Sequence, residues 1–467
     1  MPSERQNRSF HEMGKQFGSD VLSLTFFGMT FVVLNSATAA ADLLEKRANI
    51  YSNRLNPVML ASPQLIDLRG STGLMNPSDS WKRHRKIVHS RLNKHMVHVF
   101  RKQQQYQANA LLQRMLSISH REQSLESLEL ELGRTIASTA FDMIYGYPLA
   151  VADDPFLLGQ MTLTANLAKA VMPSNFLVNV LPFLAYVPAW LPGAGWKKTA
   201  LEWRKQKDHT IGSIFSWTKT QIANGADDHS ITATALMELQ QLGYNQDDAD
   251  EFAKNFSEAL YEGATDTSTS SLLAFLLAMM LYPETQLKAQ KEIDSVIGQD
   301  RLPTIEDRAN LPYINALILE VLRWEPALPL AIPHVCTEDN EYRGYHIPKG
   351  AVVFGNIWSI SHDEKTYNDP ELFNPARFLD PDTPIPPSFG WGRRICPGNH
   401  FAQEMLFIII SSILAAFTIS NTGGESVEEN YLLVEGEGSS LTYRPKPFKC
   451  TIKPRSEKHS ELISNVE

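Results

Sequence analysis

The sequence predicts a mainly α protein with small β-sheets, folded as a single large domain. Three observations support this prediction. Apolar residues make up 43% and charged residues 20% of the 467-residue chain, which is ordinary globular composition. Long amphipathic helical patterns dominate residues 79–324, and short strand-like pieces flank that stretch. The chain shows no internal repeat, low-complexity tract or linker, so nothing divides it.

The chain begins with a polar segment of mixed charge that lacks the apolar core of a signal peptide. We therefore expect residues 1–17 to be a flexible N-terminal segment without a membrane anchor. Residues 21–41 alternate between apolar and polar side chains, which predicts a β-hairpin with its turn near Gly28. A helix should follow, capped near Asn35 or Ser36. A membrane-spanning helix over 21–41 is the alternative that we disfavour.

Two later stretches also bear on the fold. Asn245 can cap a helix that continues to Leu281 and stops before Pro283, a length of roughly 54 Å. Residues 170–196 carry four prolines, which exclude a simple spanning helix and favour short helices and loops. Such a piece could cover a pocket or touch a bilayer surface, and plain buried core is an equal alternative. Residues 455–467 form a polar tail that we expect to fray.

Composition excludes several classes of function. The formal net charge of −9 argues against a general nucleic-acid binder, which needs an excess of Lys and Arg. The three cysteines, Cys336, Cys396 and Cys450, cannot build a disulfide framework or an all-cysteine metal cluster. An odd count favours a reducing compartment. It also raises the question whether one thiol is functional.

Cys396 has the surroundings that favour a reactive sulfur. It lies in the segment FGWGRRICPG, after a turn containing Gly390 and Gly392 and two arginines, Arg393 and Arg394. An apolar helix starts directly after Pro397 and Gly398, so the positive end of the helix dipole should favour a thiolate. A thiolate in such a loop is suited to bind a soft metal. A buried, inert cysteine is the alternative, and we assign Cys336 and Cys450 to it.

This segment resembles the haem-binding signature of the cytochrome P-450 family, F-x-x-G-x-R-x-C-x-G. Phe389, Gly392, Arg394, Cys396 and Gly398 match every fixed position. The resemblance implies that Cys396 is the axial thiolate ligand of haem b (iron protoporphyrin IX). It also implies that Arg394 pairs with a haem propionate. An axial thiolate donates electron density that favours cleavage of the O–O bond.

A second motif lies inside the long helix, in the segment GATDTS. Gly263 and the neighbouring hydroxyl residues are poor helix formers, so we expect a local bulge or bend there. The segment resembles the family's oxygen-activation motif, [AG]-[GA]-x-[DE]-T-[TS]. That resemblance implies that Thr267 hydrogen-bonds dioxygen and that Asp266 helps to deliver protons. Gly263 and Ala264 would then border the substrate pocket. The alternative is a polar patch that faces solvent.

A third motif, E-x-x-R, comprises Glu320 and Arg323 in the segment LPYINALILEVLRWEP. One turn separates the two, so they can pair, although such pairs are usually solvated. In the family this motif joins a second arginine, which Arg377 supplies here in FNPARF. The resemblance implies a Glu320–Arg323–Arg377 network that stabilises the fold and takes no part in catalysis.

The segment WKRHRKIVHSRLNK resembles the family's W-x-x-x-R helix. The resemblance implies that Trp81 and Arg85 touch haem propionates. The remaining basic residues could form a positive face for an acidic flavoprotein electron donor, or an ordinary solvated helix face. A zinc site among the histidines of this region is disfavoured, because no Cys or carboxylate joins them at ligand spacing.

The segment EPALPLAIPH should form an extended wall, since its prolines exclude a helix. In the family this stretch lines the substrate pocket. The candidates are Leu328, Leu330, Ala331 and Ile332, and His334 is a candidate to reach a haem propionate.

Together the motifs imply a haem-thiolate monooxygenase over residues 18–454, most similar to fungal (basidiomycete) members of the family. Such an enzyme hydroxylates a lipophilic small molecule, such as a terpenoid, steroid-like, polyketide or aromatic compound. It uses O₂ and electrons from NADPH–cytochrome P-450 reductase. The cytoplasmic face of the endoplasmic reticulum is the expected location, although a soluble or peripheral protein is an alternative because no N-terminal anchor is evident.

One departure from the family pattern stands out, a short loop over residues 379–388 just before the cysteine segment. It raises the possibility of altered packing beneath the haem. Two other functions therefore stay open. One is a haem-thiolate isomerase or dehydratase that needs no reductase, which the Asp266–Thr267 pair argues against. The other is a non-catalytic haem protein from a truncated gene.

Overall fold

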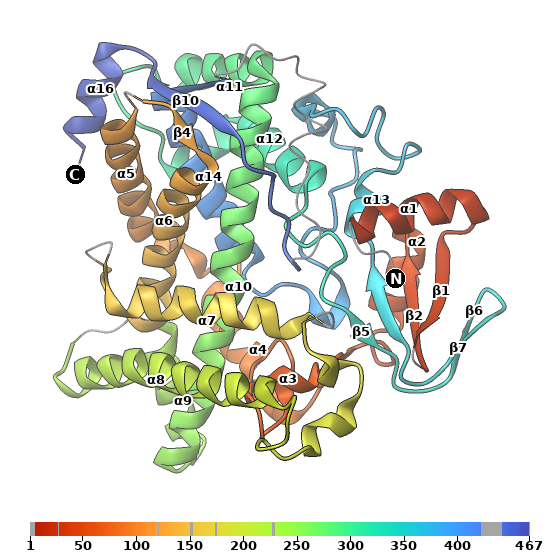
Figure 1. Cartoon of the computed structure of the whole chain (residues 1–467). Helices are drawn as coiled ribbons and strands as arrows, with labels where there is room; N and C mark the ends of the chain where they lie inside the picture. Colours follow the sequence, from red (N-terminus) through yellow and green to blue (C-terminus); the bar gives the residue numbers. More distant parts are fainter. Residues whose placement is uncertain are drawn as a thin grey trace.

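The structure is a computed structural model, and it describes residues 5–26, 28–119, 121–149, 153–172, 175–226, 229–421 and 441–466. Parts of three expected segments therefore lie outside the described residues: 1–4 of the N-terminal segment, 173–174 of the 170–196 stretch and 467 of the C-terminal tail. The described chain forms one mostly helical body with small sheets at its margins, as the sequence predicts (Figure 1).

Helices make up most of the body, and α10 runs through its middle (Figure 1). The α-helices are α1 Gln6–Phe17, α2 Ala37–Ala40, α3 Val58–Ala61, α4 Asp79–Leu92, α5 Arg101–Ile118, α6 Leu125–Tyr145, α7 Pro155–Val171, α8 Gly195–Ala223, α9 Ile231–Gln241, α10 Gln246–Leu281, α11 Pro283–Val296, α12 Pro312–Trp324, α13 Ile357–Ser361, α14 Asn399–Ala416 and α16 Glu457–Ser464. Single turns of tighter helix include η3 Leu177–Asn179, η4 Pro182–Tyr186, η6 Pro375–Leu379 and η7 Gly392–Arg394, and a wider turn, η1, covers Ala41–Lys46.

The largest sheet gathers strands from both ends of the sequence, in the order β1-β2-β8-β5-β3. Its strands are β1 Val21–Phe26, β2 Met29–Leu34, β3 Asn53–Arg54, β5 His334–Val335 and β8 Val352–Gly355. β1 and β2 form the predicted hairpin, with Phe26 opposite Met29 and Gly28 in the left-handed conformation at φ 78°. β2 then pairs parallel with β8, which joins the N-terminal residues to the segment before the cysteine loop.

Two smaller sheets complete the fold. One has the order β4-β10-β9, built from Gln123–Ser124, Lys449–Pro454 and Phe417–Asn421. The other pairs β6 Asn340–Tyr342 with β7 Tyr345–Ile347.

Helix α10 is long because its start and stop are well defined. The Asn245 side chain accepts a hydrogen bond from the Asp248 backbone N–H at 2.9 Å, and Pro283 begins the next helix. Its C-terminal half, from Ser268 onward, is buried throughout, and the helix as a whole contacts α6, α8, α9, α11, α12 and α14. Among the described residues, α10 and α14 are long and apolar enough to cross a membrane, but both lie largely inside the core.

The two ends of the chain differ from expectation. Residues 6–17, predicted to be flexible, form helix α1, which buries Phe10 against Leu22 and Val33. The Asn35 side chain also donates to the Phe10 carbonyl at 2.8 Å. The helix is polar overall, which suggests a flexible segment, but its few apolar side chains share one face, and the packing of that face against β1 and β2 stabilises it.

The predicted frayed tail is also helical. Helix α16 buries His459 and Ile463, which lie one turn apart. Just before it, the Arg455 guanidinium pairs with the Asp294 carboxylate at 2.5 Å. These anchors hold a polar helix that composition alone assigns to a free end.

Candidate active site

A cavity of about 1460 Å³ lies at the centre of the protein, and its lining is mostly apolar. The cysteine loop forms one wall and helix α10 forms another, so Cys396 and Thr267 border the same space. All six residues expected in a substrate pocket line this cavity. They are Gly263, Ala264, Leu328, Leu330, Ala331 and Ile332.

The cysteine loop is shaped by two glycines in the left-handed conformation. Gly390 and Gly392 have φ values of 76° and 52°. A Cβ atom on Gly392 would lie 2.6 Å from the Leu44 carbonyl oxygen, so only glycine lets the loop pack against η1. The Cys396 backbone N–H donates to the Phe389 carbonyl at 2.8 Å, which closes the loop below the sulfur. The geometry explains why these residue types stand at these positions.

The charge state of Cys396 differs from the sequence argument. We expected the helix dipole and nearby arginines to favour the thiolate. In the structure, burial raises the pKa of the Cys396 thiol, and the opposing effects of the Gly398 backbone N–H and Arg85 are smaller. Without a cation bound to the sulfur, desolvation outweighs the dipole, and a positively charged metal would reverse that balance.

Arg394 and Trp81 form one unit beside the cysteine. The Arg394 guanidinium lies 4.5 Å from the centre of the Trp81 ring, and Arg85 lies 6.0 Å from the same ring. Arg394 also donates to the backbone carbonyls of Ser52 (2.8 Å) and Met75 (2.6 Å). Trp81, Arg85 and Arg394, three of the four predicted propionate contacts, line the cavity.

Arg54 is a site residue that sequence reasoning missed. It lines the cavity, and its Nη1 donates to the carbonyls of Ile332 and Pro333, at 2.7 Å and 3.0 Å. Its Nε is buried and has no hydrogen-bond partner among the described residues. Burial, with help from Arg394 and Arg85, lowers its pKa to about 9. No local pattern indicates this role, because a lone arginine after a short strand is usually solvated.

His334 lines the cavity as predicted and is neutral in this environment. Its Nδ1 bonds the Tyr51 carbonyl, and burial, Arg54 and Arg394 together lower its pKa to about 3. It can therefore bind a carboxylate only through a neutral N–H.

The residues present fit a haem group. Arg54, Arg85 and Arg394 border one cavity and raise one another's electrostatic energy. A ligand with two carboxylates would offset that repulsion and could satisfy the orphaned Nε of Arg54. Cys396 supplies the soft ligand that suits haem iron. The donor set, one thiol beside three cations in an apolar cavity, matches an iron porphyrin with two propionates.

The GATDTS segment is helical without interruption, so the expected bulge is wrong. Its hydroxyl groups bond back to the preceding turn: Thr265 to the Tyr261 carbonyl (3.0 Å) and Thr267 to the Gly263 carbonyl (2.9 Å). These bonds let poor helix formers stay in the helix without opening its backbone ladder.

Asp266 is held by residues near the C-terminus. Its carboxylate pairs with the Arg444 guanidinium and accepts a hydrogen bond from the Thr442 hydroxyl at 2.6 Å. Arg444 also pairs with Glu129 of α6 at 2.9 Å. Sequence reasoning missed Thr442 and Arg444, because only the fold brings the end of the chain onto α10.

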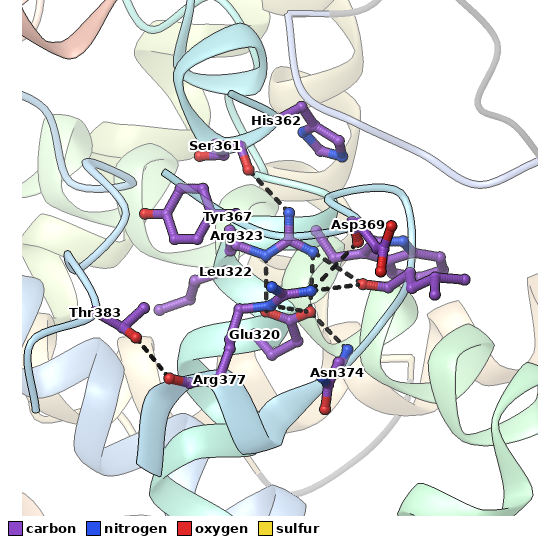
Figure 2. A network of polar contacts seen from close by, with 12 residues as sticks. Glu320, Leu322, Arg323, Ser361, His362, Tyr367, Asp369, Asn374, Arg377 and Thr383 are labelled. Atoms are coloured by element: carbon purple, nitrogen blue, oxygen red, sulfur yellow. Dashed lines mark hydrogen bonds and ion pairs between the residues drawn. The ribbon is translucent and has the colours of Figure 1, made fainter. Parts of the chain in front are cut away.

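The third motif forms a buried network, shown in Figure 2. Arg323 makes two bonds to Glu320, at 2.7 Å and 2.9 Å, and both side chains are fully buried. Arg377 reaches the same carboxylate at 3.2 Å, and the Asn374 backbone N–H donates to it at 2.7 Å. The arginines also bind backbone carbonyls, among them Ser361 and Asn368. The structure thus brings the three predicted residues together, away from the cavity lining.

The short loop over 379–388 is anchored despite its length. The Thr383 hydroxyl donates to the Arg377 carbonyl (2.7 Å), Tyr367 donates to the Pro384 carbonyl (2.9 Å), and Ser388 donates to the Leu322 carbonyl (2.8 Å). The loop therefore ties the Glu320 network to the cysteine segment.

Helix α4 divides its basic residues between interior and surface. His84 is buried and bonds Thr72, while Lys82, Lys86 and Lys94, just beyond the helix end, are exposed. Arg83 bonds the Tyr244 hydroxyl. The described residues contain no group of three or more His, Cys, Asp or Glu side chains arranged to hold a metal.

The described part of residues 170–196 combines a small core with an exposed apolar surface. Ala170, Val178 and Ala185 are buried. In contrast, Tyr186 and Trp190 are 79% and 80% exposed, and Leu177 and Phe183 are also exposed.

Comparisons with a family model and with curated proteins all identify the same family. The family model described as "Cytochrome P450" matches residues 2–451. "Cytochrome P450 monooxygenase 98" of Postia placenta is 36% identical, covering 100% of this chain and 90% of that protein. "Cytochrome P450 monooxygenase COX2" of Coprinopsis cinerea is 37% identical (100% and 88%). "Tryptamine 4-monooxygenase" of Psilocybe cyanescens is 31% identical (100% and 91%).

Among solved structures, a zebra fish cytochrome P-450 with abiraterone has a TM-score of 0.77 and 23% identity, covering 97% of this chain and 100% of that one. The same source provides a structure with progesterone, at a TM-score of 0.78 and 24% identity. At this identity the likeness supports the fold.

Proposed function

The chain belongs to the cytochrome P-450 family and is a monooxygenase of the fungal type, and from this premise we propose that it hydroxylates a lipophilic small molecule, with electrons from NADPH–cytochrome P-450 reductase. The observation that carries the proposal is the single apolar cavity that Cys396, Thr267 and the three arginines share. An apolar lining favours a lipophilic substrate, and it excludes water from the reacting atoms.

We assign cofactor binding to the residues around the cysteine loop. Cys396 would ligate the iron of haem b, and Arg54, Arg85, Arg394, Trp81 and His334 would bind its propionates. Phe389, Gly392 and Gly398 shape the loop. When bound, the haem supplies the oxidation chemistry, and the thiolate ligand favours O–O cleavage.

The protein's own contribution to oxygen activation lies on α10. The Thr267 hydroxyl donates to the Gly263 carbonyl, so its oxygen can accept a proton or a further hydrogen bond from the cavity side. Asp266 is the acid next to it, and its carboxylate can pass protons only when it leaves Arg444 or Thr442. We propose that this release is the step at which protons enter the cavity.

The wall opposite α10 positions the substrate. Leu328, Leu330, Ala331 and Ile332 present apolar atoms to the cavity, and Ala331 adopts a left-handed backbone conformation at φ 55°. Gly263 and Ala264 leave space on the α10 side. A substrate would lie between these walls with its oxidised carbon toward Cys396.

Two surfaces suit the expected partners. The exposed lysines of the α4 region, Lys82, Lys86 and Lys94, offer positive charge for an acidic flavoprotein. The exposed apolar residues around Trp190 suit peripheral contact with a bilayer. Members of the family are often associated with the endoplasmic reticulum, and we propose its cytoplasmic face as the location.

A reductase-dependence assay tests the proposed function. The haem-loaded protein should form a hydroxylated product only when NADPH, the reductase and O₂ are all present. Turnover of an organic peroxide without reductase or O₂, and no product from the complete system, would instead show the isomerase or dehydratase activity. A protein that binds haem and forms no product with any substrate class would support a non-catalytic role.

A further inference from the structure

Two glutamates of α10, Glu258 and Glu262, accept hydrogen bonds from side chains of helix α7 and border the cavity. Gln160 Nε2 donates to both oxygens of Glu258, at 2.9 Å and 2.8 Å. One turn further along both helices, the Thr164 hydroxyl donates to Glu262 at 2.8 Å. Glu258, Glu262 and Thr164 all line the cavity, which is otherwise mostly apolar. The sequence showed only two glutamates four residues apart on a helix.

The two acids affect one another's protonation. Burial raises the pKa of both carboxyls, each side chain hydrogen-bonds the other, and the negative charge of Glu258 raises the pKa of Glu262 further. Two like charges this close cannot both ionise in a dry site. At least one of the two carboxyls therefore holds a proton near neutral pH, and a bound cation would favour ionisation of the other.

The described surroundings offer little positive charge to the pair. The cation that acts on Glu258 is Lys207, and its ammonium already bonds the Asp67 carbonyl (2.8 Å) and Asp208 (3.1 Å). Asp266, one turn beyond Glu262, adds further negative charge. The Tyr145 hydroxyl, in a side chain only 1% exposed, lies within electrostatic range of the pair and has no hydrogen-bond partner among the described residues.

Hydrogen-bond capacity points the same way. The pair has four carboxyl oxygens, and the described donors from other residues are one amide of Gln160 and one hydroxyl of Thr164. Acceptor capacity is therefore in surplus on Glu262, which is only partly buried and whose open side borders the cavity. An ammonium group brings three donors and one positive charge, which is what this site lacks.

We propose that the substrate is a lipophilic amine, whose protonated nitrogen binds Glu262 and the Glu258 carboxyl behind it while its apolar body extends toward Cys396. This inference rests on the proposed function and deepens it by naming the substrate class. Glu262 is thus a specificity-determining residue.

The position on the helix restricts which carbon is oxidised. Glu262 precedes Thr267 by five residues, which is roughly 7.5 Å along the helix axis. An amine bound at Glu262 therefore places a carbon several bonds from its nitrogen near the oxygen-activating residues. Oxidation should occur on the apolar or aromatic body of the substrate, and not at the carbon bearing the nitrogen.

A purely structural role is the alternative, in which the hydrogen bonds of Glu258 and Glu262 only join α7 to α10. Binding to the ferric, haem-loaded enzyme separates the two roles. The probes are tryptamine and tryptophol, which share one aromatic body and differ in an amino or a hydroxyl group. Equilibrium dialysis at neutral pH gives both dissociation constants, and the Soret shift reports whether the nitrogen binds the iron.

The wild-type protein should bind tryptamine at least about ten-fold more tightly than tryptophol, without a nitrogen-ligand spectrum. Glu262→Gln should weaken tryptamine binding at least about ten-fold and change tryptophol binding less than about two-fold. Glu262→Asp keeps the carboxyl group and should retain most of the preference. The matched control is Glu126→Gln, which removes an exposed carboxylate at the border of the same cavity and should change neither constant.

Equal affinity of the wild type for both probes overturns the inference, whether or not the variants fold. Equal losses for both probes in Glu262→Gln also overturn it, since they indicate a structural role. A Soret shift that shows the tryptamine nitrogen bound to iron, and that Glu262→Gln leaves unchanged, would overturn the inference too. An amine preference without reductase-dependent product would leave the inference standing and contradict the proposed function. Reductase-dependent product from neutral compounds only would support the proposed function and overturn the inference about amines.

Discussion

Arg444 forms an ion pair with Asp266, an aspartate 178 residues earlier in the chain. The pair joins the end of the chain to the centre of α10, and Thr442 binds the other carboxylate oxygen. Asp266 is therefore an oriented acid and not a freely moving one. Its proton transfer should depend on how readily the Arg444 contact opens.

The first prediction concerns this contact. Asp266→Asn should lower the rate of product formation by about 10- to 100-fold, because the amide cannot deliver a proton. Arg444→Met should lower it only about 2- to 10-fold, since the acid remains but loses its orientation. Product formed per NADPH consumed, measured with the reductase present, checks both. The control is Glu129→Gln, which removes the other partner of Arg444 and leaves the Asp266–Arg444 pair in place. Wild-type rates in Asp266→Asn would exclude Asp266 from the proton path.

The second prediction concerns Thr267. Thr267→Ala should keep the haem spectrum while diverting most of the electrons from NADPH to hydrogen peroxide, because the cavity-side hydroxyl is lost. Thr265→Ala loses the same kind of back-bond, to Tyr261, but two residues earlier and on another side of the helix. It should keep product and peroxide yields near those of the wild type. Tight coupling in Thr267→Ala would refute the relay role.

The third prediction is that Arg54→Leu stabilises the haem-free protein and weakens haem retention in the haem-loaded protein. Arg54→Leu should stabilise the haem-free protein, because the lowered pKa of Arg54, about 9, shows that burial and neighbouring cations disfavour its charge. At neutral pH, below that pKa and the usual one, the full cost applies. The same variant should lose haem about ten-fold faster, since a buried charge-assisted bond is worth about 1.5–3 kcal/mol.

Thermal unfolding of the haem-free protein and haem transfer to an acceptor protein measure the two effects. Arg69→Leu, which removes an arginine that is 64% exposed, should change neither. A haem-free Arg54→Leu protein less stable than the wild type would show that Arg54 serves the fold and not the cofactor.

The fourth prediction concerns the network of Figure 2. Glu320→Gln should destabilise the protein by about 3–5 kcal/mol, because it leaves the fully buried charge of Arg323 without its partner. Arg301→Ala breaks the Arg301–Asp307 pair, in which the arginine side chain is 50% exposed, and should cost less than about 1 kcal/mol. Denaturant unfolding of the two variants gives the comparison. Similar stabilities would mean that the network carries little of the fold.

Much of the fold could be predicted from local signals. The hairpin turn at Gly28, the Asn245 cap and the Pro283 stop are encoded by single residues and appear in the structure as expected. Helix α1 could not be predicted in this way, because the burial of Phe10 depends on Leu22 and Val33. The expected bulge in α10 was wrong because Thr265 and Thr267 return their hydroxyl bonds to the helix.

The site residues likewise include some that local motifs identify and others that only long-range contacts bring to the site. Cys396 and Thr267 lie in motifs of fixed spacing, so the sequence identifies them without the fold. Arg54 and Arg444 reach the site only through long-range contacts, with Ile332 and Asp266 respectively. The pKa of Cys396 shows the limit of sequence reasoning about charge. A neighbouring arginine can be read from the sequence, but the degree of burial that outweighs it cannot.

The most direct test of this account is the carbon-monoxide difference spectrum of the reduced, haem-loaded protein and its three cysteine variants. The wild type, Cys336→Ala and Cys450→Ala should show the red-shifted Soret band of a thiolate ligand, because Cys336 and Cys450 are buried away from the cavity lining. Cys396→Ala should lose that band. A wild-type protein without the band, or a Cys396→Ala protein that keeps it, would contradict the central claim that Cys396 binds haem iron.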